Sequence, residues 1–178
     1  MEKKGGVVGI IFFFGLLFII LIGGFIMAVG GAVTGWVFDT AVPEVSNLGM
    51  VGDSNITQIA ELTVVPMNNL IQNVGWLIGV LYVMALFGSI GFALYSRTTS
   101  EKWLIGFYFG LMLLLLMGSV MISNMYEDFY NDAGEFALRL QDQSLISYMI
   151  IQSPLIFTII GFITGIIMFS GMGREETA

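Results

Sequence analysis

The chain has 178 residues, of which 57% are hydrophobic and 11% are charged, and its formal net charge is −7. Soluble domains are about 45–50% apolar and about 25% charged, so this composition excludes an ordinary water-soluble fold. The chain contains no cysteine and no histidine. Disulfides, zinc sites built from these residues and iron–sulfur clusters are therefore excluded, and we expect no metal and no cofactor.

Four long apolar runs follow one another along the chain, at about 7–38, 70–95, 103–123 and 148–170. A helix crosses the ~30 Å hydrocarbon core of a bilayer in about 20 residues, so each run is long enough for one span. We therefore predict an all-α integral membrane protein, a four-helix bundle that forms a single membrane domain over residues 1–178. The first run is longer than the apolar region of a signal peptide, so we expect a retained signal-anchor helix.

Basic and acidic residues lie on opposite sides of this arrangement. Five of the six basic residues flank the runs on one side: Lys3, Lys4, Arg97, Lys102 and Arg174. The other two connections, about 39–67 and 124–147, carry nine of the 13 acidic residues and one base, Arg139. Because excess Lys and Arg marks the cytoplasmic side, both termini are predicted on the cytoplasmic or equivalent inner side, with two acidic outer segments.

Each acidic outer segment is predicted to contain a short amphipathic helix. In the first segment, residues 54–62 have a capping residue at their start, and Pro66 is expected to end the helix. In the second, four apolar residues share a helical spacing: Met125, Phe129, Phe136 and Leu140. Either the third helix continues outward as a rod, or it breaks at 131–134 and a separate helix lies on the surface, which we favour.

This stripe of four residues is the candidate contact surface for a partner. An acidic helix is poorly suited to an anionic membrane surface, where basic residues normally supply the attraction. The stripe is therefore predicted to pack on protein, either on the 54–63 helix or on a neighbouring subunit. In the fourth run, Pro154 is either an early-turn residue capped by Ser153 or a kink.

Glycines four residues apart occur in every predicted span, where small residues let helix backbones approach closely. These helix-packing candidates are Gly31 with Gly35, Gly75 with Gly79, Gly106 with Gly110, and Gly161 with Gly165. The second span opens on a polar cluster: Asn68, Asn69, Gln72 and Asn73. These amides either cap the helix at the interface, bond to a partner helix or line a pore mouth.

No charged residue lies in the centre of any span, which argues against proton-coupled transport and removes the usual acid–base groups of a membrane enzyme. We therefore expect a non-enzymatic structural or accessory subunit of a larger membrane assembly, cellular or in a virion membrane. Its expected partners are the lipid bilayer and other membrane subunits, identical or different, but not nucleic acid. The alternative is a small oligomeric channel whose acidic outer face attracts cations.

Overall fold

The structure is a computed structural model that describes residues 5–95 and 103–170. These residues form six helices and one small hairpin of two strands. In chain order they are α1 (Gly5–Ser46), β1 (Met50–Val51), β2 (Ser54–Asn55), α2 (Ile56–Tyr95), α3 (Trp103–Tyr130), α4 (Glu135–Asp142), α5 (Ser144–Ile151) and α6 (Ser153–Phe169). The five basic residues on which the predicted orientation depends lie outside the described residues.

Three helices are long and apolar enough to cross a membrane: Val7–Ser46 within α1, Gly75–Leu94 within α2, and α3. A fourth candidate consists of α5 and α6 together, although these two helices meet at an angle of 68°. The chain therefore has the helices of a multi-pass membrane protein, with three spans or, if the bent pair counts as one, four.

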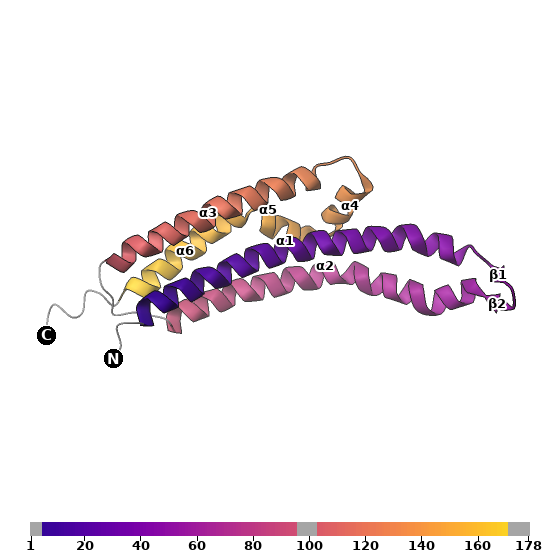
Figure 1. The fold of residues 1–178 in the computed structure, drawn as a ribbon, viewed down its shortest axis with the longest axis horizontal. Coiled ribbons are helices and arrows are strands. Elements are labelled where there is room, and N and C mark those ends of the chain that lie inside the picture. The colour runs from indigo at the N-terminus through magenta and orange to yellow at the C-terminus, as the bar shows by residue number, and fades with distance from the viewer. Residues whose placement is uncertain (1–4, 96–102, 171–178) are drawn as a thin grey trace.

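The helices form two neighbouring antiparallel pairs, a long one of α1 with α2 and a shorter one of α3 with α6 (Figure 1). The start of α1, the end of α2, the start of α3 and the end of α6 lie together at one end of the molecule. At the other end, the α1–α2 hairpin continues past the remaining helices. We refer to residues 41–70 of this hairpin as the arm.

The core lies along α1, which packs against α2 and α3. Phe13, Phe14, Leu17 and Leu21 are buried there, and the ring of Tyr108 on α3 lies 4.9 Å from that of Phe14. In a lipid environment burial from water gives no drive between helices, so close packing of these side chains must supply the attraction.

The first acidic segment, 39–67, differs from its prediction. The first run does not end at about Phe38, because α1 continues through Pro43 to Ser46. The turn is confined to residues 47–55, where Gly49 and Gly52 have positive φ angles of 64° and 63°, a conformation that only glycine adopts without cost. A tight hairpin of α1 on α2 replaces the expected long connection.

The helix predicted over 54–62 begins two residues later, at Ile56, because Ser54 and Asn55 form β2. The side chain of Asn55 caps it by accepting a hydrogen bond from the Gln58 N–H at 3.1 Å. The expected stop at Pro66 is wrong, because α2 runs through Pro66 to Tyr95. Proline removes one helical hydrogen bond, but α2 packs against α1, and this contact offsets the local cost.

The second acidic segment contains the break that the sequence favoured. The helix α3 continues beyond 123 to Tyr130, and after residues 131–134 the short helix α4 turns back. Pro154 is an early-turn residue of α6, but Gln152, not Ser153, is the residue that precedes this helix, and no side chain caps it.

Candidate functional site

A short helix, α5, packs between the other helices, and several buried polar side chains form hydrogen bonds around it. A single residue, Gln143, separates it from α4, and Gln152 separates it from α6. The helix α5 contacts α1, α2 and α3, and its Ile146 and Ile150 are fully buried. An eight-residue helix is too short to span a bilayer, so α5 acts as a brace within the bundle.

Two of the predicted glycines make room for this brace. A Cβ atom added to Gly75 would lie 2.5 Å from Cγ of Gln143, and one added to Gly79 would lie 2.8 Å from Cδ2 of Leu145. Both distances are far shorter than van der Waals contact. The pair on α2 therefore lets the backbone of α2 approach the start of α5.

Buried hydroxyl groups attach α5 to α3. The hydroxyls of Tyr126 and Ser147 are 2.7 Å apart, and Ser147 also donates to the Leu140 carbonyl at 2.7 Å. Ser123 donates to the Ile151 carbonyl at 2.6 Å, at the last turn of α5. These hydrogen bonds satisfy polar groups near the bend between α5 and α6, where the backbone hydrogen bonds of the helix are interrupted.

Gln143 connects the brace to α1. Its side-chain nitrogen donates to the Ala28 carbonyl at 3.3 Å, whereas its buried side-chain oxygen accepts no hydrogen bond from the described residues. A cavity of about 220 Å³ lies beside this amide, lined by Gly31, Ala32, Gly35, Gly75, Arg139, Asp142 and Gln143. The cavity is polar and large enough for water molecules, which are the simplest partners for the amide oxygen.

The helix α4 is held against α1 by an ion pair and a hydrogen bond. Arg139, the lone base of the acidic segments, forms an ion pair with Asp39 of α1 and lies 3.4 Å from Asp142. One turn away, the indole N–H of Trp36 donates to the Glu135 carboxylate at 3.0 Å. These contacts fasten the second acidic segment to the base of the arm.

The predicted stripe is not one continuous surface, because the chain reverses at 131–134. Met125 and Phe129 lie on α3 and remain exposed, at 49% and 41%, whereas Phe136 is partly buried and Leu140 is fully buried. The rings of Phe129 and Phe136 contact each other across the reversal, with centroids 6.3 Å apart. The buried half thus packs within the chain on α1 and α3, rather than on residues 54–63.

The remaining glycine pairs differ in their surroundings. A Cβ atom at Gly31 would meet Gln143 at 3.4 Å, and one at Gly35 would lie 4.0 Å from Arg139. Gly106 and Gly110 have no described atom of another element within 4 Å, so this pair faces outward from the chain. Whether these outward glycines pack against a partner stays a prediction.

The polar cluster at the start of the second run lies within α2. Asn69 and Asn73 are exposed, and the Asn73 side chain donates to the Asn69 carbonyl at 2.8 Å. The side chains of Asn68 and Gln72 lie outside the described set. The two described amides therefore face away from the core and do not line a channel within one chain.

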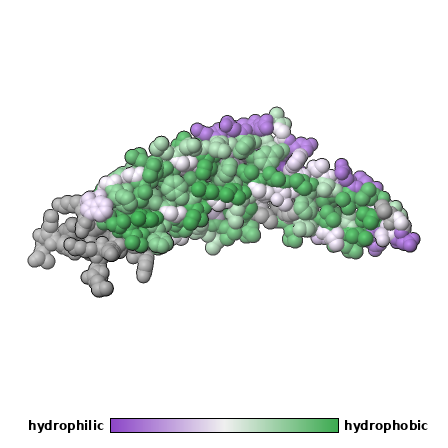
Figure 2. Space-filling model, in the orientation of Figure 1, coloured by the Kyte–Doolittle hydropathy of each residue, from purple (hydrophilic) through white to green (hydrophobic). Residues whose placement is uncertain are grey.

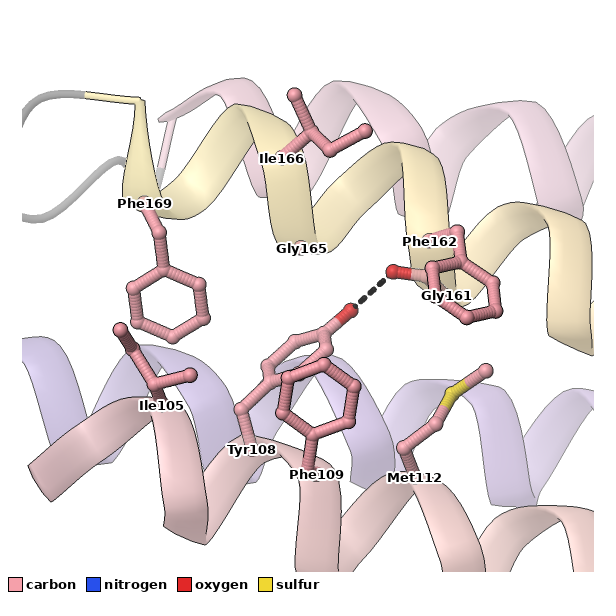
Figure 3. A pocket seen from close by; sticks show the side chains of 9 residues that line it. All are labelled: Ile105, Tyr108, Phe109, Met112, Gly161, Phe162, Gly165, Ile166 and Phe169. Carbon is pink, nitrogen blue, oxygen red and sulfur yellow. Dashed lines mark hydrogen bonds between the residues drawn. The ribbon is translucent and has the colours of Figure 1, made fainter.

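A second cavity, of about 200 Å³, is an apolar groove between α3 and α6 (Figure 3). Gly161 and Gly165 form its floor on α6, and the side chains of Tyr108 and Met112 extend toward it from α3. The Tyr108 hydroxyl donates to the Gly161 carbonyl at 2.7 Å and lies 2.9 Å from Thr164 Oγ1. With this hydroxyl occupied, the groove offers apolar contact only.

A metal site would need several converging ligands. Among residues 5–95 and 103–170, no three acidic side chains are close enough to hold an ion together, and cysteine and histidine are absent from the sequence. Arg139 lies within the most acidic part of the site and pairs with two of its carboxylates.

Sequence analysis missed the brace. The boundary between the second outer segment and the fourth span was predicted at 147–148, inside α5, although five polar residues lie in this region: Gln143, Ser144, Ser147, Gln152 and Ser153. Polar side chains with a spacing of three to five residues are costly inside lipid unless they face protein. That spacing was the signal for a broken helix at this point.

No protein-family model, curated protein or solved structure matches this chain.

Proposed function

We propose that this chain is a non-enzymatic structural or accessory subunit of a larger membrane assembly. It crosses the membrane four times, with α5 and α6 together as the fourth span, and both termini face the inner side. The arm then projects from the outer surface. The observation that supports this proposal best is the arm itself, because its length and exposed apolar residues have no use within a single chain.

The length of α1 places the arm outside the hydrocarbon. A helix of 42 residues is about 63 Å long, roughly twice the ~30 Å thickness of the hydrocarbon core. If the span begins near Val7, it ends near Ala28, at the level where Gln143 contacts α1. Residues 41–70 then lie in water, together with the charged side chains of Glu44, Asp53 and Glu61.

Large apolar side chains are nevertheless exposed on the arm. Leu48, Met50, Leu62 and Leu70 have exposed fractions of 57%, 65%, 72% and 70%. Figure 2 shows that apolar surface continues onto the hairpin end of the molecule, beside hydrophilic residues. Exposed apolar surface outside a membrane marks a contact with another protein, which supports a subunit role.

The experiment is to isolate the tagged chain from its native membranes in lipid nanodiscs and measure the particle mass. We expect a particle larger than one 19.5 kDa chain with its lipid. Replacing Leu48, Met50 and Leu62 together by serine should release the partners. The control replaces Leu113 and Met117, which are equally exposed but on the spanning part of α3, by alanine and should leave the particle intact. A monomer in nanodiscs and in several mild detergents would contradict the proposal.

The exposed side-chain amides of Asn69 and Asn73 favour a channel as the second candidate function. Phe13, Phe14 and Leu17 fill the bundle centre, so a pore would have to form between copies, with Asn69 and Asn73 toward it. Recording from planar bilayers tests this function. A conductance that changes in the Asn69→Ala and Asn73→Ala variants would replace the subunit proposal by the channel, and silent bilayers at high protein load would remove the channel.

Orientation is tested with single cysteines, which can be introduced cleanly because the chain has none. We expect an impermeant maleimide to label Ser54→Cys and Asn131→Cys in intact membranes but not Ser100→Cys. Labelling of position 100 in correctly oriented membranes would overturn the proposed topology.

A further inference from the structure

The exposed face of α2 carries a long uncharged seam. Its residues follow one another at spacings of four and three, the repeat of a left-handed coiled coil. The seam consists of Ile59, Thr63, Pro66, Leu70, Asn73, Leu77, Val80, Met84, Phe87 and Gly91. All are exposed except Val80, which is half-buried. The seam therefore runs without interruption from the arm into the spanning part of α2.

Contact with lipid explains the exposure of only some of the apolar side chains on this seam. Leu77, Met84 and Phe87 lie in the apolar stretch Gly75–Leu94, where exposed apolar side chains contact lipid at no cost. Ile59 and Leu70 lie on the arm, with exposed fractions of 51% and 70%. The same face thus remains apolar after it leaves the hydrocarbon, where water would otherwise contact it.

The charge pattern favours a second copy of this chain as the partner. The outer segments carry nine acidic residues and one base, so two copies repel each other over most of their outer surface. The seam has no charge. Glu61, the one charged residue of α2 between 56 and 95, follows Ile59 by two residues and is rotated about 200° around the helix, away from the seam. On the seam, two identical chains can therefore approach without repulsion.

The amide at Asn73 is complementary to itself. One of its N–H groups donates to the Asn69 carbonyl, which leaves a second N–H and the side-chain oxygen exposed. Another Asn73 presents the same donor and acceptor. An asparagine within an apolar seam is a known means of fixing register and copy number, because any other alignment leaves it unpaired against apolar residues.

We infer that two copies of this chain pair in parallel through the α2 seam, with the Asn73 side chains facing each other at the two-fold axis. Copies inserted with the same topology point the same way, so the axis lies along the membrane normal. Each seam residue then meets the same residue of the second copy. Near the inner end, Gly91 and the neighbouring Gly88, which have no described atom within 4 Å of a Cβ position, permit close approach. The inference extends the proposed function by naming one partner.

Self-crosslinking of single cysteines tests the geometry in lipid nanodiscs. We expect Ile59→Cys and Leu70→Cys to form covalent dimers under mild oxidation, because both positions face their own copies. Glu61→Cys is the matched control, since it is also exposed and adjacent in sequence but lies off the seam. Crosslinking that is absent at 59 and 70, or equally strong at 61, would overturn the inference.

A charge exchange provides a second test that does not depend on cysteine chemistry. Leu70→Glu and Leu70→Lys should each abolish the dimer when expressed alone, and their co-expression should restore it as a mixed pair. Asn73→Ala should weaken dimerisation about threefold to tenfold, as expected for one hydrogen bond between membrane helices. If the mixed pair fails to form, the inference is wrong.

The outcomes separate this inference from the proposed function. A large native particle without crosslinking at 59 or 70 would retain the subunit role and reject the α2 dimer. A monomer in all preparations would reject both.

Discussion

The bundle and the arm are built from the same two helices, yet different neighbours surround them. Beside α5, the helix α2 approaches a third element so closely that there is no room for a side chain at Gly75 or Gly79. On the arm the two helices pack on each other, and Leu62 is 72% exposed. The first region is stabilised within the chain, whereas the second leaves large apolar side chains exposed, which the proposed function assigns to contact with another protein.

This comparison also shows that exposure has no fixed meaning in a membrane protein. Met84 and Leu62 have similar exposed fractions, 63% and 72%. Met84 belongs to the apolar stretch Gly75–Leu94 of α2, where an exposed side chain can contact lipid, while Leu62 lies on the arm beside Glu61 and Thr63. Under the proposed topology, apolar exposure is unfavourable on the arm and in the second acidic segment, because water would contact the side chains there.

The largest effect is expected where the bundle has least space. Gly75→Ala places a methyl group 2.5 Å from Cγ of Gln143, near the backbone of α5, so the brace must shift. We expect a loss of about 1–3 kcal/mol in unfolding free energy, measured by denaturation in mixed micelles. Gly106→Ala is the control, since no described atom of another element lies within 4 Å of its Cβ position. Equal stability of the two variants would show that α5 does not pack in this way.

A smaller effect is expected from the hydroxyl that joins α3 to α5. Tyr126→Phe removes the partner of the Ser147 hydroxyl at 2.7 Å and should cost about 0.5–1.5 kcal/mol. Tyr148→Phe alters a tyrosine on α5 that is 61% exposed, and it should be nearly neutral. Unfolding curves recorded side by side measure the difference, and a larger loss for Tyr148→Phe would contradict the arrangement.

The ion pair at the base of the arm should contribute less. The side chains of Arg139 and Asp39 are 32% and 21% exposed, so water and salt screen their attraction. Arg139→Ala should lower stability by about 0.2–1 kcal/mol and increase proteolysis within residues 131–143, where α4 is fastened to α1. Raising the salt concentration should reduce the difference from wild type. Unchanged proteolysis would mean that α4 is held by its apolar contacts alone.

The smallest effect on stability is expected on the arm. Leu62→Ser should change the unfolding free energy by less than about 0.5 kcal/mol, because the side chain is mostly exposed in the single chain. The same variant should lower recovery of the assembly from membranes. If it instead unfolds the chain as Gly75→Ala does, the arm belongs to the folded core and the contrast between the two regions fails.

Much of the helical framework follows from the sequence, because hydropathy acts locally. The predicted runs 7–38, 70–95 and 103–123 overlap the apolar stretches Val7–Ser46, Gly75–Leu94 and Trp103–Tyr130 of α1, α2 and α3, since a run of about 20 apolar residues is stable in lipid only as a helix. The break at 131–134 was also readable from Asn131, Asp132 and Gly134, which favour turns over helix. The four-span count and the orientation of the termini remain predictions.

Other features of the fold depend on contacts between residues that are far apart in the sequence. Pro66 is a local signal to stop a helix, and only the packing of α2 along α1 shows why the helix continues. The stripe from Met125 to Leu140 has a helical period in sequence, but a reversal of the chain divides it between two helices. The polar residues around Gln143 indicate a break in the helix but not the partners of Gln143, because those lie on α1 and α2, more than 60 residues away in the sequence. Periodicity reports which faces are apolar, whereas only the assembled helices determine which element each face meets.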